Sequence, residues 1–195
     1  MARYAAVETF LTCEQSIVWD WARTLMRSRD AGGERKQKEM STKKALRVFV
    51  SYSHKDAKLK DRMLEHLAQL RHDDLISVWH DRELLAADDW DETILAELRS
   101  SDLILFLVSS AFTDSRYCYE KELRIAVEMH EAGQAKAVPV ILRPCDWQSS
   151  PLGKLVALPQ YGRPVTSRRW KTYDEAFQNV VKELRRLVES LRAST

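Results

Sequence analysis

The chain has 195 residues, of which 45% are hydrophobic and 31% are charged, so it is long enough for one globular domain with a short appendage. Its net charge is +2 and its acidic and basic residues are interspersed, which argues against a nucleic-acid-binding protein with a clustered basic face. The longest apolar run, Leu103 to Val108, is too short to cross a bilayer, so we expect no membrane-spanning segment.

The beginning of the chain differs in pattern from the rest. Apolar residues at helical spacing predict an amphipathic helical segment over residues 1–29. Acidic residues interrupt this segment at Glu8, Glu14 and Asp20. A secretory signal would not contain such charges. Residues 30–44 are polar, contain two adjacent glycines and indicate a linker. Met40 is an alternative start, and the sequence leaves this choice open.

The cysteines indicate the compartment. Cys13, Cys118 and Cys145 are odd in number and far apart, which fits neither a disulfide framework nor a zinc site. We therefore expect three free thiols in a reducing cytoplasm, and no bound metal.

A regular alternation of strand and helix patterns begins with "LRVFVSY", a predicted strand over residues 46–52. A helix is predicted over "SHKDAKLKDRMLEHLAQLRH", where Ser53 and Asp56 have the spacing of a capping box. A second strand, "LISVW", and a loop, "DRELLAADD", follow. The next helix is predicted over "WDETILAELRSS", with Asp89 and Glu92 at capping spacing.

The second half of the chain continues the alternation. "DLILFLVSS" is apolar on both faces and therefore predicts a central strand. A helix is expected from "SRYCYEKEL" to about Glu131, ending near Gly133. "KAVPVIL" predicts a fourth strand, whose Pro139 indicates either an irregular strand or a place near a sheet edge, and "RPVTSR" predicts a short fifth. The last helix begins with a capping box of Thr172 and Glu175.

This order of elements predicts an α/β fold with a parallel sheet and helices on both of its faces. Such sheets bind ligands in the crevice beyond the carboxyl ends of their strands. We therefore expect the functional residues within four segments: Ser51–His54, His80–Trp90, Ser109–Glu122 and Arg143–Trp147.

Several classes of α/β protein are excluded by what the chain lacks. None of its five glycines follows a predicted strand and opens a helix, so the phosphate-binding loops of P-loop NTPases and dinucleotide-binding Rossmann domains are missing. The strand ends read "SYSHKD" and "VSS", without the aspartates of a phospho-receiver domain. No Gly-x-Ser-x-Gly elbow and no histidine pair with metal-ligand spacing occurs.

Four stretches in order, "VFVSYSHKD", "SVWHDRELLAADDW", "SDLILFLVSSAFTDSRYCYEKEL" and "AVPVILRPCDW", resemble the Toll/interleukin receptor (TIR) family, and its bacterial members in particular. The resemblance covers about residues 46–165 and implies a flavodoxin-like, doubly wound sheet of about five parallel strands. The expected domains are then the helical segment 1–29, the linker 30–44 and a TIR domain over 45–195. Many TIR domains cleave NAD+ between nicotinamide and ribose, whereas others act only as assembling scaffolds.

The resemblance implies a catalytic role for Glu122, which matches the glutamate that catalytic TIR domains require. A fixed carboxylate can stabilise the oxocarbenium character that develops on the ribose. The alternative is that Glu122 is a solvated residue in the first turn of a helix, favoured there by the helix dipole. Glu120 is the competing carboxylate, expected to be exposed.

Further substrate contacts are implied at strand ends. Trp90 matches an aromatic residue that stacks on the dinucleotide, although it also suits ordinary packing at a helix start. Ser53 and His54 lie in the turn after the first strand, where the family contacts substrate. The alternative for Ser53 is a role as helix N-cap, and the alternative for His54 is an exposed loop histidine without a role.

Four more residues are expected around the same crevice: Asp81, Ser110, Tyr117 and Cys118. We expect the cysteine to pack beside Glu122 rather than to act as a nucleophile. The loop "LLAADDW" lacks the Pro-Gly pair common in the family, so its conformation is not carried over.

These observations favour a cytoplasmic NAD+ nucleosidase in defence or stress signalling, with NAD+ as substrate and no separate cofactor. A non-catalytic TIR adaptor is the alternative, and a nucleoside deoxyribosyltransferase-like enzyme is a third, less well matched by the cysteine motif and "CDW". The expected partners are NAD+, further copies of the chain and other TIR proteins.

Overall fold

A parallel sheet forms the centre of the protein. The computed structural model describes residues 44–80, 90–115 and 121–194. Within these ranges the sheet has four strands in the order β2-β1-β3-β4. Their bounds are β1 (Leu46–Tyr52), β2 (Ile76–Trp79), β3 (Leu103–Val108) and β4 (Lys136–Ile141). The predicted doubly wound α/β fold is confirmed.

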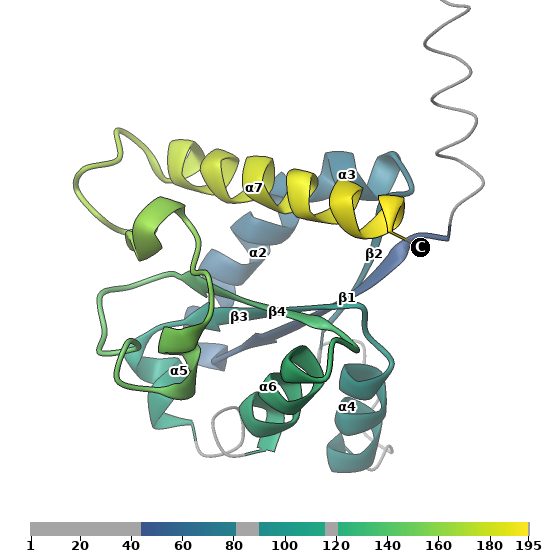
Figure 1. Cartoon of the computed structure of the whole chain (residues 1–195). Helices are drawn as coiled ribbons and strands as arrows, with labels where there is room; N and C mark the ends of the chain where they lie inside the picture. The colour runs from purple at the N-terminus through teal and green to yellow at the C-terminus, as the bar shows by residue number, and fades with distance from the viewer. Residues whose placement is uncertain (1–43, 81–89, 116–120, 195) are drawn as a thin grey trace, which may run out of the picture. The chain divides into compact units, whose positions relative to one another are not determined.

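Helices cover both faces of this sheet (Figure 1). On one face lie α2 (Ala57–His66), α3 (Ala68–His72) and α7 (Tyr173–Ala193), and on the other lie α4 (Trp90–Arg99) and α6 (Leu123–Glu131). The short helix α5 (Ser110–Asp114), which the sequence did not predict, follows β3 directly. Shorter 3₁₀ helices are η1 (His54–Asp56), η4 (Pro151–Lys154) and η5 (Gln160–Gly162).

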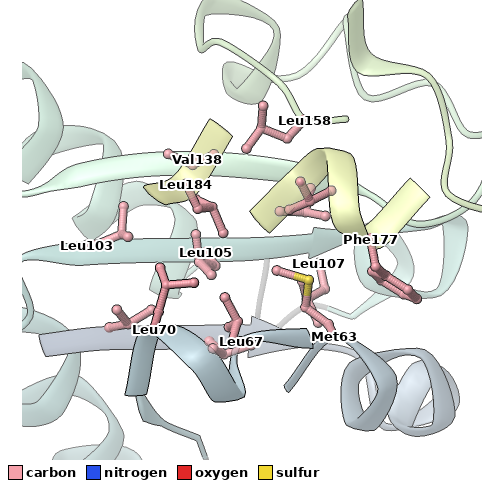
Figure 2. Packing of buried hydrophobic residues seen from close by; sticks show 14 of the residues in the cluster. Met63, Leu67, Leu70, Leu103, Leu105, Leu107, Val138, Leu158, Phe177 and Leu184 are labelled. Atoms are coloured by element: carbon pink, nitrogen blue, oxygen red, sulfur yellow. The ribbon is translucent and has the colours of Figure 1, made fainter. Parts of the chain in front are cut away.

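The core explains why β3 is apolar throughout. Leu103, Leu105 and Leu107 pack with residues of α2, α3 and α7, as Figure 2 shows, whereas Ile104 and Phe106 belong to the cluster on the α4 and α6 side. Successive side chains of a strand point to opposite faces, so a strand between two helical layers must be apolar at every position. Truncating one of these leucines to alanine would cost about 2–5 kcal/mol.

The fifth predicted strand is not formed, although its segment does lie against the sheet. Among the described residues, β4 is an edge strand, as Pro139 indicated. An isolated bridge joins Val140 and Leu158, and the amides of Val165 and Thr166 donate to the carbonyls of Ile141 and Leu142 at 2.8 and 3.1 Å. A segment without regular secondary structure therefore makes hydrogen bonds with β4 at this edge, where the sequence predicted a strand.

The predicted helix over residues 53–72 is divided into η1, α2 and α3. The side chain of Ser53 makes no capping hydrogen bond, and neither does that of Asp56, so the capping box predicted there is wrong. At α7 the prediction is confirmed, because Thr172 Oγ1 accepts a hydrogen bond from the amide of Glu175 at 3.1 Å. Gly133 ends α6 with a φ of 72°, a conformation that glycine adopts without strain.

Candidate functional site

The order of the strands gives the sheet a switch point between the carboxyl ends of β1 and β3, where parallel α/β sheets bind their ligands. After β1 the chain forms β2 on one side of it and then crosses to form β3 on the other side. Loops that leave two neighbouring strands in opposite directions create a ligand-binding crevice at such a switch point. The residues that follow Tyr52 and Val108 are therefore the first place to look for a site.

Glu122 is buried beside the end of β1. Only 4% of its surface is exposed, and its carboxylate accepts a hydrogen bond from the hydroxyl of Ser51. Ser51 lies on the same face of β1 as Phe49, which belongs to the cluster on the α4 and α6 side. The interpretation of Glu122 as a solvated first-turn residue is therefore wrong.

The local backbone accounts for the position of Glu122. Lys121 and Glu122 form a π-type turn that leads into α6, and such widened turns often occur at functional sites. Burial of a carboxylate costs free energy unless it is hydrogen-bonded. A glutamate that only interacted with solvent would therefore be destabilising at this position. Its burial and its hydrogen bond with Ser51 hold the Glu122 carboxylate in place, as in a preorganised site.

A second buried carboxylate, Asp56, lies beyond the ends of the strands. It is 2% exposed and accepts a hydrogen bond from the hydroxyl of Ser109, the residue after β3. Its other oxygen accepts one from Nε of Arg143 at 2.8 Å, just after β4. Asp56 therefore joins three strand ends, which explains why it does not cap α2.

This cluster of Asp56, Ser109 and Arg143 was missed as a site by sequence reasoning. Ser109 and Arg143 lie within the segments where functional residues were expected, but neither was singled out. The spacing of Asp56 from Ser53 indicates only a local capping box. The usable signal was that polar residues follow each of three adjacent parallel strands.

The structure also describes three other predicted site residues, Ser53, His54 and Ser110. Ser53 is buried in the turn after β1, and His54 is exposed with its ring edge-on to Tyr52 at 5.7 Å between centroids. Ser110 is exposed at the start of α5, whereas its neighbour Ser109 is the buried N-cap and accepts from the amide of Phe112. The strand-end serine that the structure joins to a buried carboxylate is therefore Ser109, through its hydrogen bond to Asp56.

The remaining predicted contacts are not described. Trp90 begins α4, as expected for a helix start, and nothing is described of its side chain. Asp81, Tyr117, Cys118 and the competing Glu120 lie outside the described residues, as does the whole loop 81–89 before Trp90.

Cys145 is a half-buried free thiol close to this cluster. Burial raises its pKa, and the negative charges of Asp146 and Asp56 raise it further. A thiol with a raised pKa stays protonated at neutral pH and is a weak nucleophile. Cys145 is therefore not a candidate for covalent catalysis.

Neither a metal site nor a membrane span is found in the part of the chain that the structure describes. No group of three or more histidine, cysteine, aspartate or glutamate residues there is arranged to hold a metal ion. No helix within these ranges is both long and apolar enough to cross a membrane.

The fold and the crevice define a flavodoxin-like α/β domain with two buried carboxylates at the carboxyl edge of its sheet. The sequence matches the TIR domain family over residues 48–181, and the chain belongs to this family. An uncharacterized protein of the bacterium Sinorhizobium fredii, y4lF, is 44% identical over 138 residues. That match covers 71% of this chain but only 42% of the relative.

A solved structure with a TM-score above 0.5 supports the same fold, and a second TIR domain is a more distant match. The TIR domains of the activated Roq1 resistosome, which recognises the pathogen effector XopQ, have a TM-score of 0.53 and 16% identity, over 72% of this chain and 99% of theirs. The TIR domain of the Toll-related receptor TRR-2 from Hydra magnipapillata has a TM-score of 0.46 and 15% identity, over 71% of this chain and 97% of its own.

Proposed function

We propose that the chain is a TIR-domain NAD+ nucleosidase that hydrolyses the bond between nicotinamide and ribose, with Glu122 as its catalytic carboxylate. The observation that carries the proposal is the buried hydrogen bond between Ser51 and Glu122 beside the β1–β3 crevice. A carboxylate fixed before the reaction begins stabilises developing positive charge without further reorganisation.

The chemistry needs one carboxylate rather than two. Both electrons of the C1′–N bond pass to the pyridinium nitrogen, so nicotinamide leaves as a neutral molecule without a general acid. The ribose then carries oxocarbenium character, which the negative charge of Glu122 stabilises. Water adds to C1′ and loses a proton, giving ADP-ribose. Ser51 orients the carboxylate through its hydroxyl.

Incubation of concentrated protein with NAD+, followed by chromatographic detection of nicotinamide and ADP-ribose or a cyclised isomer, tests this proposal. Nicotinamide release that Glu122→Gln removes would support it. Absence of product with folded wild-type protein, at concentrations that permit assembly, would contradict it.

A second candidate is a non-catalytic adaptor that works through TIR–TIR contacts in defence or stress signalling. The observation that favours it is the likeness in fold to the TIR domains of the Roq1 resistosome, an assembly. This function predicts concentration-dependent association with no NAD+ turnover, in which Glu122→Gln changes nothing. Self-association and contacts with other TIR proteins are compatible with both candidates, as is a cytoplasmic location.

A further inference from the structure

Arg143 is much more exposed than the other two residues of its cluster. Asp56 and Ser109 are buried, whereas 49% of the Arg143 side chain is exposed. Nε of Arg143 donates to Asp56 at 2.8 Å, and Ser109 donates to the other carboxylate oxygen. The guanidinium is therefore held from its buried side and open on its outer side.

Nε of Arg143 contacts Asp56, which leaves the two terminal nitrogens, Nη1 and Nη2, for other contacts. The described residues give Nη1 and Nη2 no hydrogen-bond acceptor, since Nε alone makes the contact with Asp56. A guanidinium presents its N–H groups in a planar fork that matches a phosphate in two parallel hydrogen bonds. Because the hydrogen bond to Asp56 already restrains the guanidinium, less side-chain freedom is lost when an anion binds.

The position of the fork relative to Glu122 follows from the strand register. Ser51, which donates to Glu122, is paired with Phe106 of β3, and Ser109 lies three residues further along the chain. At about 3.3 Å per residue, Ser109 lies roughly 10 Å further along the strand direction than Ser51, and the odd offset turns its side chain toward the α2 and α7 face. An extended dinucleotide is long enough to cross the carboxyl edge of the sheet from one cluster to the other.

We propose that Arg143 binds the pyrophosphate of the dinucleotide whose ribose lies at Glu122. This inference rests on the proposed function and adds the group that recognises the phosphates. The guanidinium lies between the Asp56 carboxylate and the exposed side, so it separates that negative charge from the bound phosphate. Asp56 and Ser109 are positioning residues that act through Arg143.

Calorimetric titration with ADP-ribose tests the inference without requiring turnover. Arg143→Gln should weaken ADP-ribose binding at least about tenfold, the effect expected for a hydrogen bond to a charged group. The matched control is Arg186→Gln, which removes an equally charged side chain that pairs with Glu183 on α7. It should bind ADP-ribose as the wild type does. NAD+ kinetics should show the loss chiefly in KM.

Arg143→Gln leaves the buried Asp56 without its charged partner, which can prevent folding. Arg143→Lys is the second variant for that case. An ammonium still pairs with Asp56 but lacks the planar fork, so ADP-ribose binding should fall several-fold in a folded protein. Unchanged ADP-ribose affinity in a folded Arg143 variant, or no binding by the wild type, would overturn the inference.

The two proposals fail in distinguishable ways. Wild-type protein that binds ADP-ribose through Arg143 but does not cleave NAD+ would overturn the hydrolase and support the phosphate site. NAD+ cleavage with an unchanged KM in folded Arg143→Gln would support the hydrolase and overturn the phosphate site.

Discussion

At the scale of single residues, Glu122 is the position where burial and chemistry coincide. Replacement by glutamine keeps the size of the side chain and its hydrogen bond with Ser51 but removes the negative charge. We expect kcat for NAD+ cleavage to fall by about 10²–10³-fold, the loss typical of removing one preorganised electrostatic contact. Replacement of Glu122 by alanine, which also removes the hydrogen bond with Ser51, should abolish cleavage. Nicotinamide release at fixed protein concentration measures both.

Two glutamates provide controls for this substitution. Glu128 is exposed on the same helix and pairs with Arg124, so Glu128→Gln should cleave NAD+ at the wild-type rate. Glu120→Ala should also have little effect. Wild-type turnover in folded Glu122→Gln would contradict the assignment, and a large loss in Glu120→Ala alone would transfer the role to that residue.

Trp90 is predicted to stack on a ring of the substrate. If it does, Trp90→Ala should lower NAD+ turnover strongly, whereas Trp90→Phe retains an aromatic face and part of the activity. Thermal unfolding of each variant separates this role from packing. Equal loss of activity in both variants, together with equally lowered unfolding temperatures, would favour packing at the start of α4.

At the scale of elements, Asp73 at the end of α3 connects this helix to α7. Gln69 donates to one of its oxygens at 2.7 Å, and both terminal nitrogens of Arg185 donate to the other at 3.1 Å. The hydrogen bond from Gln69 is the main reason that the pKa of Asp73 lies below its ordinary value, and Arg185 lowers it further against the opposing effect of burial.

The sign of the pH dependence follows from this lowered pKa. The folded protein binds the Asp73 proton more weakly than the unfolded chain, so the carboxylate stabilises the fold above the unfolded pKa of about 3.9. That stabilisation is lost as the pH falls through the lower folded value. Asp73→Asn should therefore cost less than about 1 kcal/mol near neutrality, with the difference narrowing below about pH 4.

Chemical denaturation across pH, with wild type and Asp73→Asn side by side, measures this difference. Arg185→Gln should reproduce part of the loss near neutrality, because it removes the partner on α7. A difference between wild type and Asp73→Asn that stays constant down to low pH would contradict an origin in the carboxylate charge.

The elements show which parts of the fold were predictable. β3 and α7 follow from local patterns, because one is apolar at every position and the other begins with a side-chain cap. The role of Asp56 does not follow from local spacing, because its distance from Ser53 matches a capping motif while its partners, Ser109 and Arg143, lie 53 and 87 residues away and only the order of the strands brings them together. The Ser51–Glu122 hydrogen bond, across 71 residues, depends equally on strand order.

At the scale of the whole molecule, the described residues 44–80, 90–115 and 121–194 form the domain, and the predicted amphipathic segment 1–29 lies outside them without an assigned role. Its apolar stripe is predicted from the sequence as Val7, Phe10, Ile17, Trp21 and Leu25. An isolated helix of this length is marginal in water, so the stripe should be buried, either on its own domain or on a second copy.

We predict that NAD+ cleavage depends on assembly and that residues 1–29 help to control it. A stripe buried between copies would raise the local concentration of TIR domains, so the rate per subunit should rise with protein concentration in the full chain. A shortened chain beginning at Met40 should be smaller in light scattering and should need higher concentrations for the same rate. Packing on its own domain would instead leave oligomer size unchanged and lower the unfolding temperature of the shortened chain. Two monomeric proteins with equal rates per subunit at every concentration would rule out control by assembly.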